Sequence, residues 1–96
     1  MFAELGDRGG LAPCLEELAQ IAVEQARYSD AAQLLGAADS LRREIEMPHK
    51  QKERGRYESM LSRIKRALGE PAFERSWQAG SVLTLDEMAA LVGARR

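Results

Sequence analysis

The sequence has little of what small proteins use as covalent staples or metal ligands. Its 96 residues contain one cysteine, Cys14, and one histidine, His49. A lone cysteine excludes an intrachain disulfide and a cysteine-based zinc site, and it fits a reducing compartment. No apolar run approaches the roughly 20 residues of a membrane span, and the first residues lack the basic and apolar regions of a signal peptide. We therefore expect a cytoplasmic protein without membrane contact, in which Cys14 is a buried structural thiol.

An excess of charge of either sign is also missing. The 14 basic and 15 acidic residues leave a net charge of -1, so no global field would draw the chain to nucleic acid or to an anionic membrane. Only five residues are aromatic, whereas 45% are apolar and 30% charged. With abundant Ala, Leu, Glu and Arg, this composition predicts one all-α domain spanning residues 1–96.

No arrangement typical of catalysis is found. His49 has no second histidine or cysteine at ligand spacing, so a loop residue is favoured over a metal ligand or general base. No serine lies in a G-x-S-x-G context, and no G-x-x-x-x-G-K-[ST] phosphate loop is present. We expect no enzymatic activity, no cofactor and no bound metal.

Apolar periodicity predicts five helices. Their expected extents are about 12–26, 31 to near Met47, 51–68, 71 to about Gly80, and a last helix from residue 85 onward.

Local signals set the ends of these helices. Gly9 and Gly10 predict a turn before the first helix, and Asp30 is the expected N-cap of the second. Gly69 is expected to stop the third helix, and Thr84 with Glu87 forms a capping box for the last.

The first two predicted helices match a repeat register. With Ala12 as position 1 of a unit of about 34 residues, small and apolar residues fall on the positions that define a tetratricopeptide repeat. These repeat-packing residues are Leu15, Leu18, Ala19, Ala22, Ala31, Leu35 and Ala38. Their alanines would let two antiparallel helices approach closely. An ordinary antiparallel helical hairpin remains the alternative, and the proline expected near the end of the unit is replaced by Arg43.

Two long stretches carry a family resemblance. They are LAPCLEELAQIAVEQARYSDAAQLLGAADSLRREIEMP and RYESMLSRIKRALGEPAFERSWQAGSVLTLDEMAALV. They resemble the C-terminal segment of large bacterial signal-transduction ATPases with tetratricopeptide arrays, which often carry a LuxR-type or winged-helix DNA-binding domain. The resemblance spans residues 2–92, and its most specific parts are 31–38, 67–70 with Phe73 and Trp77, and 83–89.

The resemblance implies the end of a right-handed tetratricopeptide-like solenoid. Residues 1–10 would be the tail of a preceding repeat and its linker, 11–47 a helix pair, and 50–96 the C-terminal capping helices. The expected C-terminal core consists of Tyr57, Leu61, Ile64, Leu68, Phe73 and Trp77. Phe73 and Trp77, one turn apart, are expected to lock the fourth helix onto the third.

The expected function is that of a non-catalytic protein–protein interaction module from a transcriptional regulator. Leu11, Leu15 and the tail 2–5 would form an N-terminal edge through which the chain makes a homo-oligomer. The alternative is a small nucleic-acid-binding protein acting through the basic stretch 42–66. Its candidate basic patch is Arg42, Arg43, Arg63, Lys65 and Arg66. Interleaved glutamates favour a solvated helix face over contact with nucleic acid.

Overall fold

The fold consists of packed helices. The computed structural model describes residues 8–46 and 51–94, and within these ranges it contains five helices and no strand. The helices are α2 (Arg8–Glu24), α3 (Tyr28–Glu44), α4 (Gln51–Leu68), α5 (Glu70–Ser81) and α6 (Leu85–Ala94). The predicted all-α class is confirmed.

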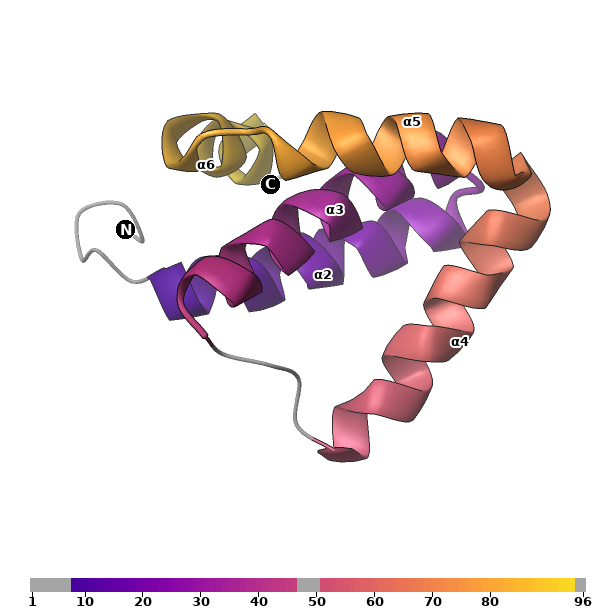
Figure 1. Cartoon of the computed structure of the whole chain (residues 1–96), viewed down its shortest axis with the longest axis horizontal. Helices are drawn as coiled ribbons and strands as arrows, with labels where there is room; N and C mark the ends of the chain where they lie inside the picture. Colours follow the sequence, from indigo (N-terminus) through magenta and orange to yellow (C-terminus); the bar gives the residue numbers. More distant parts are fainter. Residues whose placement is uncertain (1–7, 47–50, 95–96) are drawn as a thin grey trace.

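Helices α2 and α3 form an antiparallel hairpin (Figure 1). The turn between them is a Schellman motif, in which Ala26 takes the left-handed conformation with a φ of 60°. Its N–H donates to the carbonyl of Val23 at 3.0 Å, and the N–H of Arg27 donates to the carbonyl of Ala22 at 2.8 Å. These two bonds satisfy the last carbonyls of α2 and reverse the chain within three residues.

The predicted N-cap of the second helix is wrong. Helix α3 already begins at Tyr28, and its N-cap, Arg27, makes no side-chain capping bond. Asp30 lies inside the first turn, where its carboxylate is 3.7 Å from the Arg27 guanidinium. The cause is the reversal at Ala26, which brings the chain into helical geometry earlier than the apolar pattern indicates.

The predicted turn at Gly9 and Gly10 is also wrong. Gly9 and Gly10 lie inside α2, not in a turn before it. Glycine inside a helix costs only about 1 kcal/mol relative to alanine. The burial of Leu11 and Ala12 in the core outweighs this cost. At the other end of the hairpin, α3 ends at Glu44, earlier than predicted; Met47 and Pro48 lie outside the described residues.

The later helix ends follow the sequence signals. Helix α4 occupies the predicted range, and Gly69 follows it with a φ of 83°. Thr84 and Glu87 form the predicted capping box. The N–H of Thr84 donates to Oε1 of Glu87 at 2.8 Å, and the N–H of Glu87 donates to Oγ1 of Thr84 at 3.1 Å.

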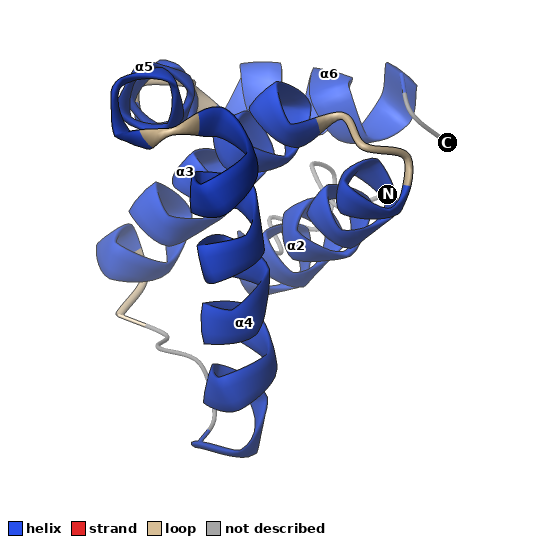
Figure 2. Cartoon of the chain, turned by 90° about the vertical axis from the view of Figure 1, so that its right-hand side faces the viewer, coloured by secondary structure: helices blue, strands red, loops and turns tan. Residues whose placement is uncertain are grey.

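Helix α5 packs mainly against α3 and only weakly against α4, so the prediction that Phe73 and Trp77 lock it onto the third helix names the wrong main partner. Figures 1 and 2 show α5 lying over α3 while α4 runs away from both. The reason is the pair of glycines at the crossing. A Cβ on Gly36 would lie 2.2 Å from the carbonyl oxygen of Trp77, and one on Gly80 would lie 1.9 Å from that of Gln33.

Substitution Gly80→Ala tests this crossing. We expect it to lower the free energy of unfolding by about 2 kcal/mol, because the added methyl group meets backbone and the two helices must separate. Urea denaturation followed by circular dichroism measures the change.

Gly55→Ala in α4 is the matched control. A Cβ there meets nothing within 4 Å, so we expect a gain of up to about 1 kcal/mol from helix propensity. Equal effects of the two substitutions would contradict the close crossing.

Candidate functional site

The predicted repeat-packing residues meet at the α2–α3 interface. Six of the seven side chains are fully enclosed: Leu15, Ala19 and Ala22 from α2, and Ala31, Leu35 and Ala38 from α3. The seventh, Leu18, is half-buried at the margin of the same core. Small side chains on both helices allow their backbones to approach closely.

The predicted C-terminal core residues join this same core. Ile64 and Phe73 are buried. Tyr57, Leu61, Leu68 and Trp77 are half-buried and pack against it. The rings of Phe73 and Trp77 have centroids 5.4 Å apart, a spacing typical of stabilising aromatic pairs.

One member of the candidate basic patch points into the fold. Arg42 donates from Nε and Nη2 to the two carboxylate oxygens of Glu16, at 2.7 and 2.9 Å. Their side chains are only 12% and 16% exposed. The hydrogen bond to Glu16 raises the pKa of the Arg42 guanidinium. Arg42 therefore ties the end of α3 to α2 and is not available to a phosphate.

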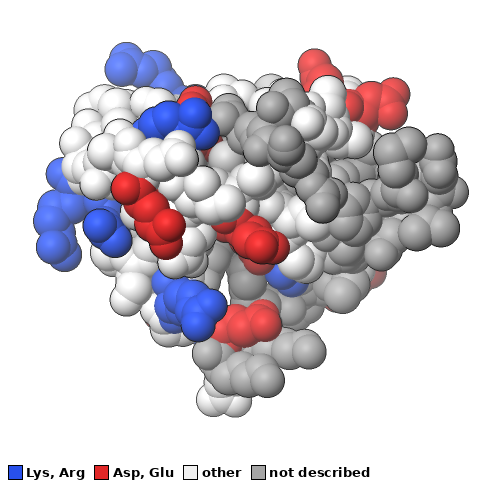
Figure 3. Space-filling view, turned by 180° about the vertical axis from the view of Figure 1, so that it is seen from behind, with Lys and Arg blue, Asp and Glu red and all other residues white. Residues whose placement is uncertain are grey.

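The other members of the patch face solvent. Arg43 is 79% exposed and pairs with Asp39 at 3.0 Å. Arg63, Lys65 and Arg66 are exposed on α4, and Nζ of Lys65 lies 5.2 Å from the centroid of the Phe73 ring. On the face shown in Figure 3, basic groups lie mostly toward one side and acidic groups lie next to several of them. The structure thus divides the patch between the end of α3 and the end of α4.

Tyr57 lies near the Arg42–Glu16 ion pair, on the inner side of α4. Burial is the main reason that its pKa is raised, and the carboxylates of Asp39 and Glu16 raise it further. The phenol stays protonated at neutral pH and acts as a packing group.

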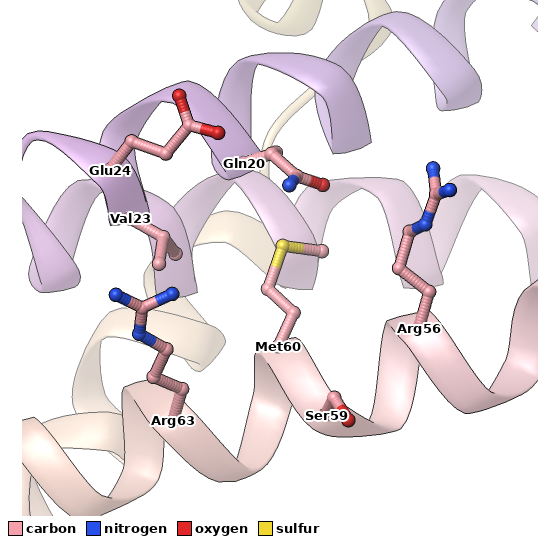
Figure 4. A pocket seen from close by; sticks show the side chains of 7 residues that line it. All are labelled: Gln20, Val23, Glu24, Arg56, Ser59, Met60 and Arg63. Carbon is pink, nitrogen blue, oxygen red and sulfur yellow. The ribbon is translucent and has the colours of Figure 1, made fainter.

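A hollow of about 180 Å³ opens between α2 and α4. Its lining residues are Gln20, Val23 and Glu24 from α2, and Arg56, Ser59, Met60 and Arg63 from α4. In Figure 4, Arg56 and Arg63 extend toward α2 on either side of Met60, while the Glu24 carboxylate points away. Of these residues, Arg63 belongs to the predicted basic patch, and Arg56 lies within the predicted basic stretch 42–66. The spacing of Arg56, Met60 and Arg63 by four and three residues was the available signal, since it places all three on one helix face.

Nothing else in the described ranges has the form of a reactive site. No group of three His, Cys, Asp or Glu residues there could hold a metal ion. None of the helices described is both long and apolar enough to cross a bilayer. Cys14, predicted to be buried, is only half-buried, and His49 and the tail 2–5 lie outside the described residues.

Comparison with known proteins points to transcriptional regulators. The chain is 32% identical over 88 residues to proteins of Mycobacterium bovis and of two strains of Mycobacterium tuberculosis, whose names class them provisionally as HTH-type transcriptional regulators. The matched region is 92% of this chain, and the chain spans about a tenth of the length of each relative. Neither a family model nor a solved structure matches it.

The buried ion pair can be tested by Arg42→Lys. We expect this change to lower the free energy of unfolding by about 1–2 kcal/mol, because an ammonium cannot reproduce the two-pronged bond to Glu16. Arg43→Lys is the control and should change it by less than about 0.5 kcal/mol, since the pair with Asp39 is exposed. Similar values for both variants in urea denaturation would show that the Glu16 pair is not structural.

Proposed function

We propose that the chain is a non-catalytic protein–protein interaction part of a bacterial transcriptional regulator that works in the cytoplasm. In this proposal α2 and α3 are a tetratricopeptide-like pair within segment 11–47. The helices of segment 50–96 cap the end of a right-handed solenoid, and segment 1–10 links to a preceding repeat. An ATPase part and a LuxR-type DNA-binding part would belong to the same regulator.

The layering of the helices is the observation that carries this proposal. Helix α3 is sandwiched between α2 and α5, and eight of its residues are buried. Helices stacked in layers, with small residues where they cross, are the construction principle of helical repeat arrays. The repeat register of the α2–α3 pair agrees with that construction.

The relatives support the regulator in this proposal more than the interaction module. Their names place them among transcriptional regulators, and this chain matches about a tenth of each. A segment of that size would serve the whole regulator by contact with a protein or with DNA, so the two must be tested against each other.

Self-association is the form of protein contact that we propose for the chain. The expected N-terminal edge needs correction, because Leu11 and Leu15 are buried within the chain and α6 packs against α2. Among the described residues of α2, Ile21 is the large apolar side chain that is exposed, at 43% accessibility. An exposed apolar residue on a helix of a repeat-like stack is a place where a further helix can pack.

We expect the 96-residue chain to associate with itself at high micromolar concentration. Sedimentation velocity over a concentration series should show a mean sedimentation coefficient that rises with concentration. A single monomeric species throughout the series would exclude the homo-oligomer.

Direct contact with DNA is the second candidate function. The letters HTH in the relatives' names stand for helix-turn-helix, a DNA-binding architecture, so the names favour this candidate over the interaction module. Helix α4 carries six basic residues and two acidic ones. Arg63, Lys65 and Arg66 lie exposed near its end, where they could contact phosphates.

A short DNA duplex labelled with fluorescein separates the two candidates. If α4 contacts DNA, anisotropy will show binding at about 50 mM salt that weakens steeply as salt is added, by about one unit of log–log slope per phosphate contact. The variant Arg63→Glu/Lys65→Glu/Arg66→Glu will then lose that binding.

For the interaction module we expect no binding of the duplex, by the chain or by this variant. Equal binding by both would count against α4 as the contact surface, because the reversed charges would repel phosphate.

A further inference from the structure

Helices α2 and α4 each carry a set of two charged residues and one apolar residue with the same spacing in the sequence. On α4, Arg56, Met60 and Arg63 follow one another at intervals of four and three residues along the hollow. On α2, the chain has an acidic stripe made of Glu17, Ile21 and Glu24, with the same intervals. Intervals of three and four place each set on one face of its helix. Each set is therefore an apolar side chain flanked by two charges, basic in the hollow and acidic in the stripe.

The charged members of both sets are exposed to solvent. Arg56 and Arg63 are exposed, as are Glu17 and Glu24. None of these four has a hydrogen bond or an ion pair with another residue in the part of the chain that the structure describes. Ile21 is one of two large apolar residues that are exposed there, and Met60 is half-buried.

The hollow can accept an apolar side chain between its two arginines. Buried Val23 and half-buried Met60 are its apolar lining residues, and Figure 4 shows Arg56 and Arg63 on either side of Met60. A volume of about 180 Å³ exceeds that of a cavity known to hold a benzene molecule. Ile21 is therefore small enough to enter.

The distance between the charges also matches. Seven residues of helix cover about 10.5 Å, so two carboxylates seven residues apart on one helix can meet two guanidinium groups seven residues apart on another. Because each apolar residue lies near the middle of its set, Ile21 would reach Met60 when the charges pair. In parallel helices Ile21 lies opposite Met60 when the charges pair. In antiparallel helices it is displaced from Met60 by one residue.

We infer that the α2–α4 hollow is the docking site for the acidic stripe of a second copy of this chain. Glu24 belongs to the stripe and also lines the hollow, so the two surfaces adjoin. Adjoining complementary surfaces can pair twice across a two-fold axis, each stripe in the other copy's hollow. The assembly is therefore a closed dimer, not an open chain. This inference rests on the self-association proposed above and names the surfaces responsible for it.

The same features fit DNA less well. Phosphate binding needs cations but no apolar surface, whereas the apolar Met60 lies between the two arginines (Figure 4) and Val23 also lines the hollow.

A charge exchange between the two surfaces tests the dimer. The variants Arg56→Glu/Arg63→Glu and Glu17→Arg/Glu24→Arg each place like charges opposite one another. Each variant alone should therefore associate at least roughly tenfold more weakly than the unchanged chain. When the two variants are mixed, both contacts of a heterodimer pair opposite charges again, so sedimentation should recover a heterodimer with an affinity close to that of the original.

Two controls keep this experiment specific. Arg54→Glu/Arg75→Glu makes the same change in net charge at exposed positions outside the hollow and should leave association unchanged. Ile21→Lys should abolish it, whereas Val82→Lys, at the other exposed apolar residue, should not. Circular dichroism checks that each variant remains folded.

The outcomes separate the two proposals. Association of the unchanged chain that both charge variants retain would overturn the inference while leaving self-association standing. A monomeric unchanged chain would overturn both. Loss of association in the variants without recovery in the mixture would also reject the proposed pairing of stripe and hollow.

Discussion

The fold depends on backbones that approach closely because side chains are absent at the crossing of α3 and α5. Gly36 faces the backbone of Trp77, and Gly80 faces that of Gln33. Alanines have the same role between α2 and α3, where all of those at the predicted packing positions are fully enclosed. In a chain with five aromatic residues, close approach supplies the density that large side chains supply elsewhere.

Because both sides of α3 are closely packed with apolar and small residues, its polar contacts lie at the edge of the core. The pair of Arg42 with Glu16 joins the last turn of α3 to the middle of α2, near Tyr57 of α4. It uses a cation from a stretch that looks continuous in the sequence, so the exposed positive charge near α4 is smaller than the sequence indicates. Of the candidate basic patch, the members that stay exposed are Arg43 on α3 and Arg63, Lys65 and Arg66 on α4.

The sequence predicts the helices better than it predicts their partners. The period of apolar residues, Gly69 and the Thr84–Glu87 box are local signals, and α4 and the start of α6 were predicted correctly because such signals act within a few residues. The contact of α5 with α3 was missed because periodicity tells which face is buried but not by what. Ala26 was missed as a turn residue because alanine is rarely left-handed. The hollow depends on the angle between α2 and α4, which no local pattern specifies.

Because α3 is packed between α2 and α5, its buried positions tolerate fewer substitutions than the positions of α4. Almost any larger side chain would be rejected at the eight buried positions of α3, so these positions can carry little that differs between related proteins. Helix α4 joins α3 to α5 in the chain but contributes less to their contact, and most of its surface is exposed. Its outer residues could be exchanged during evolution at small cost to folding, so differences in partner choice among related chains should accumulate on α4.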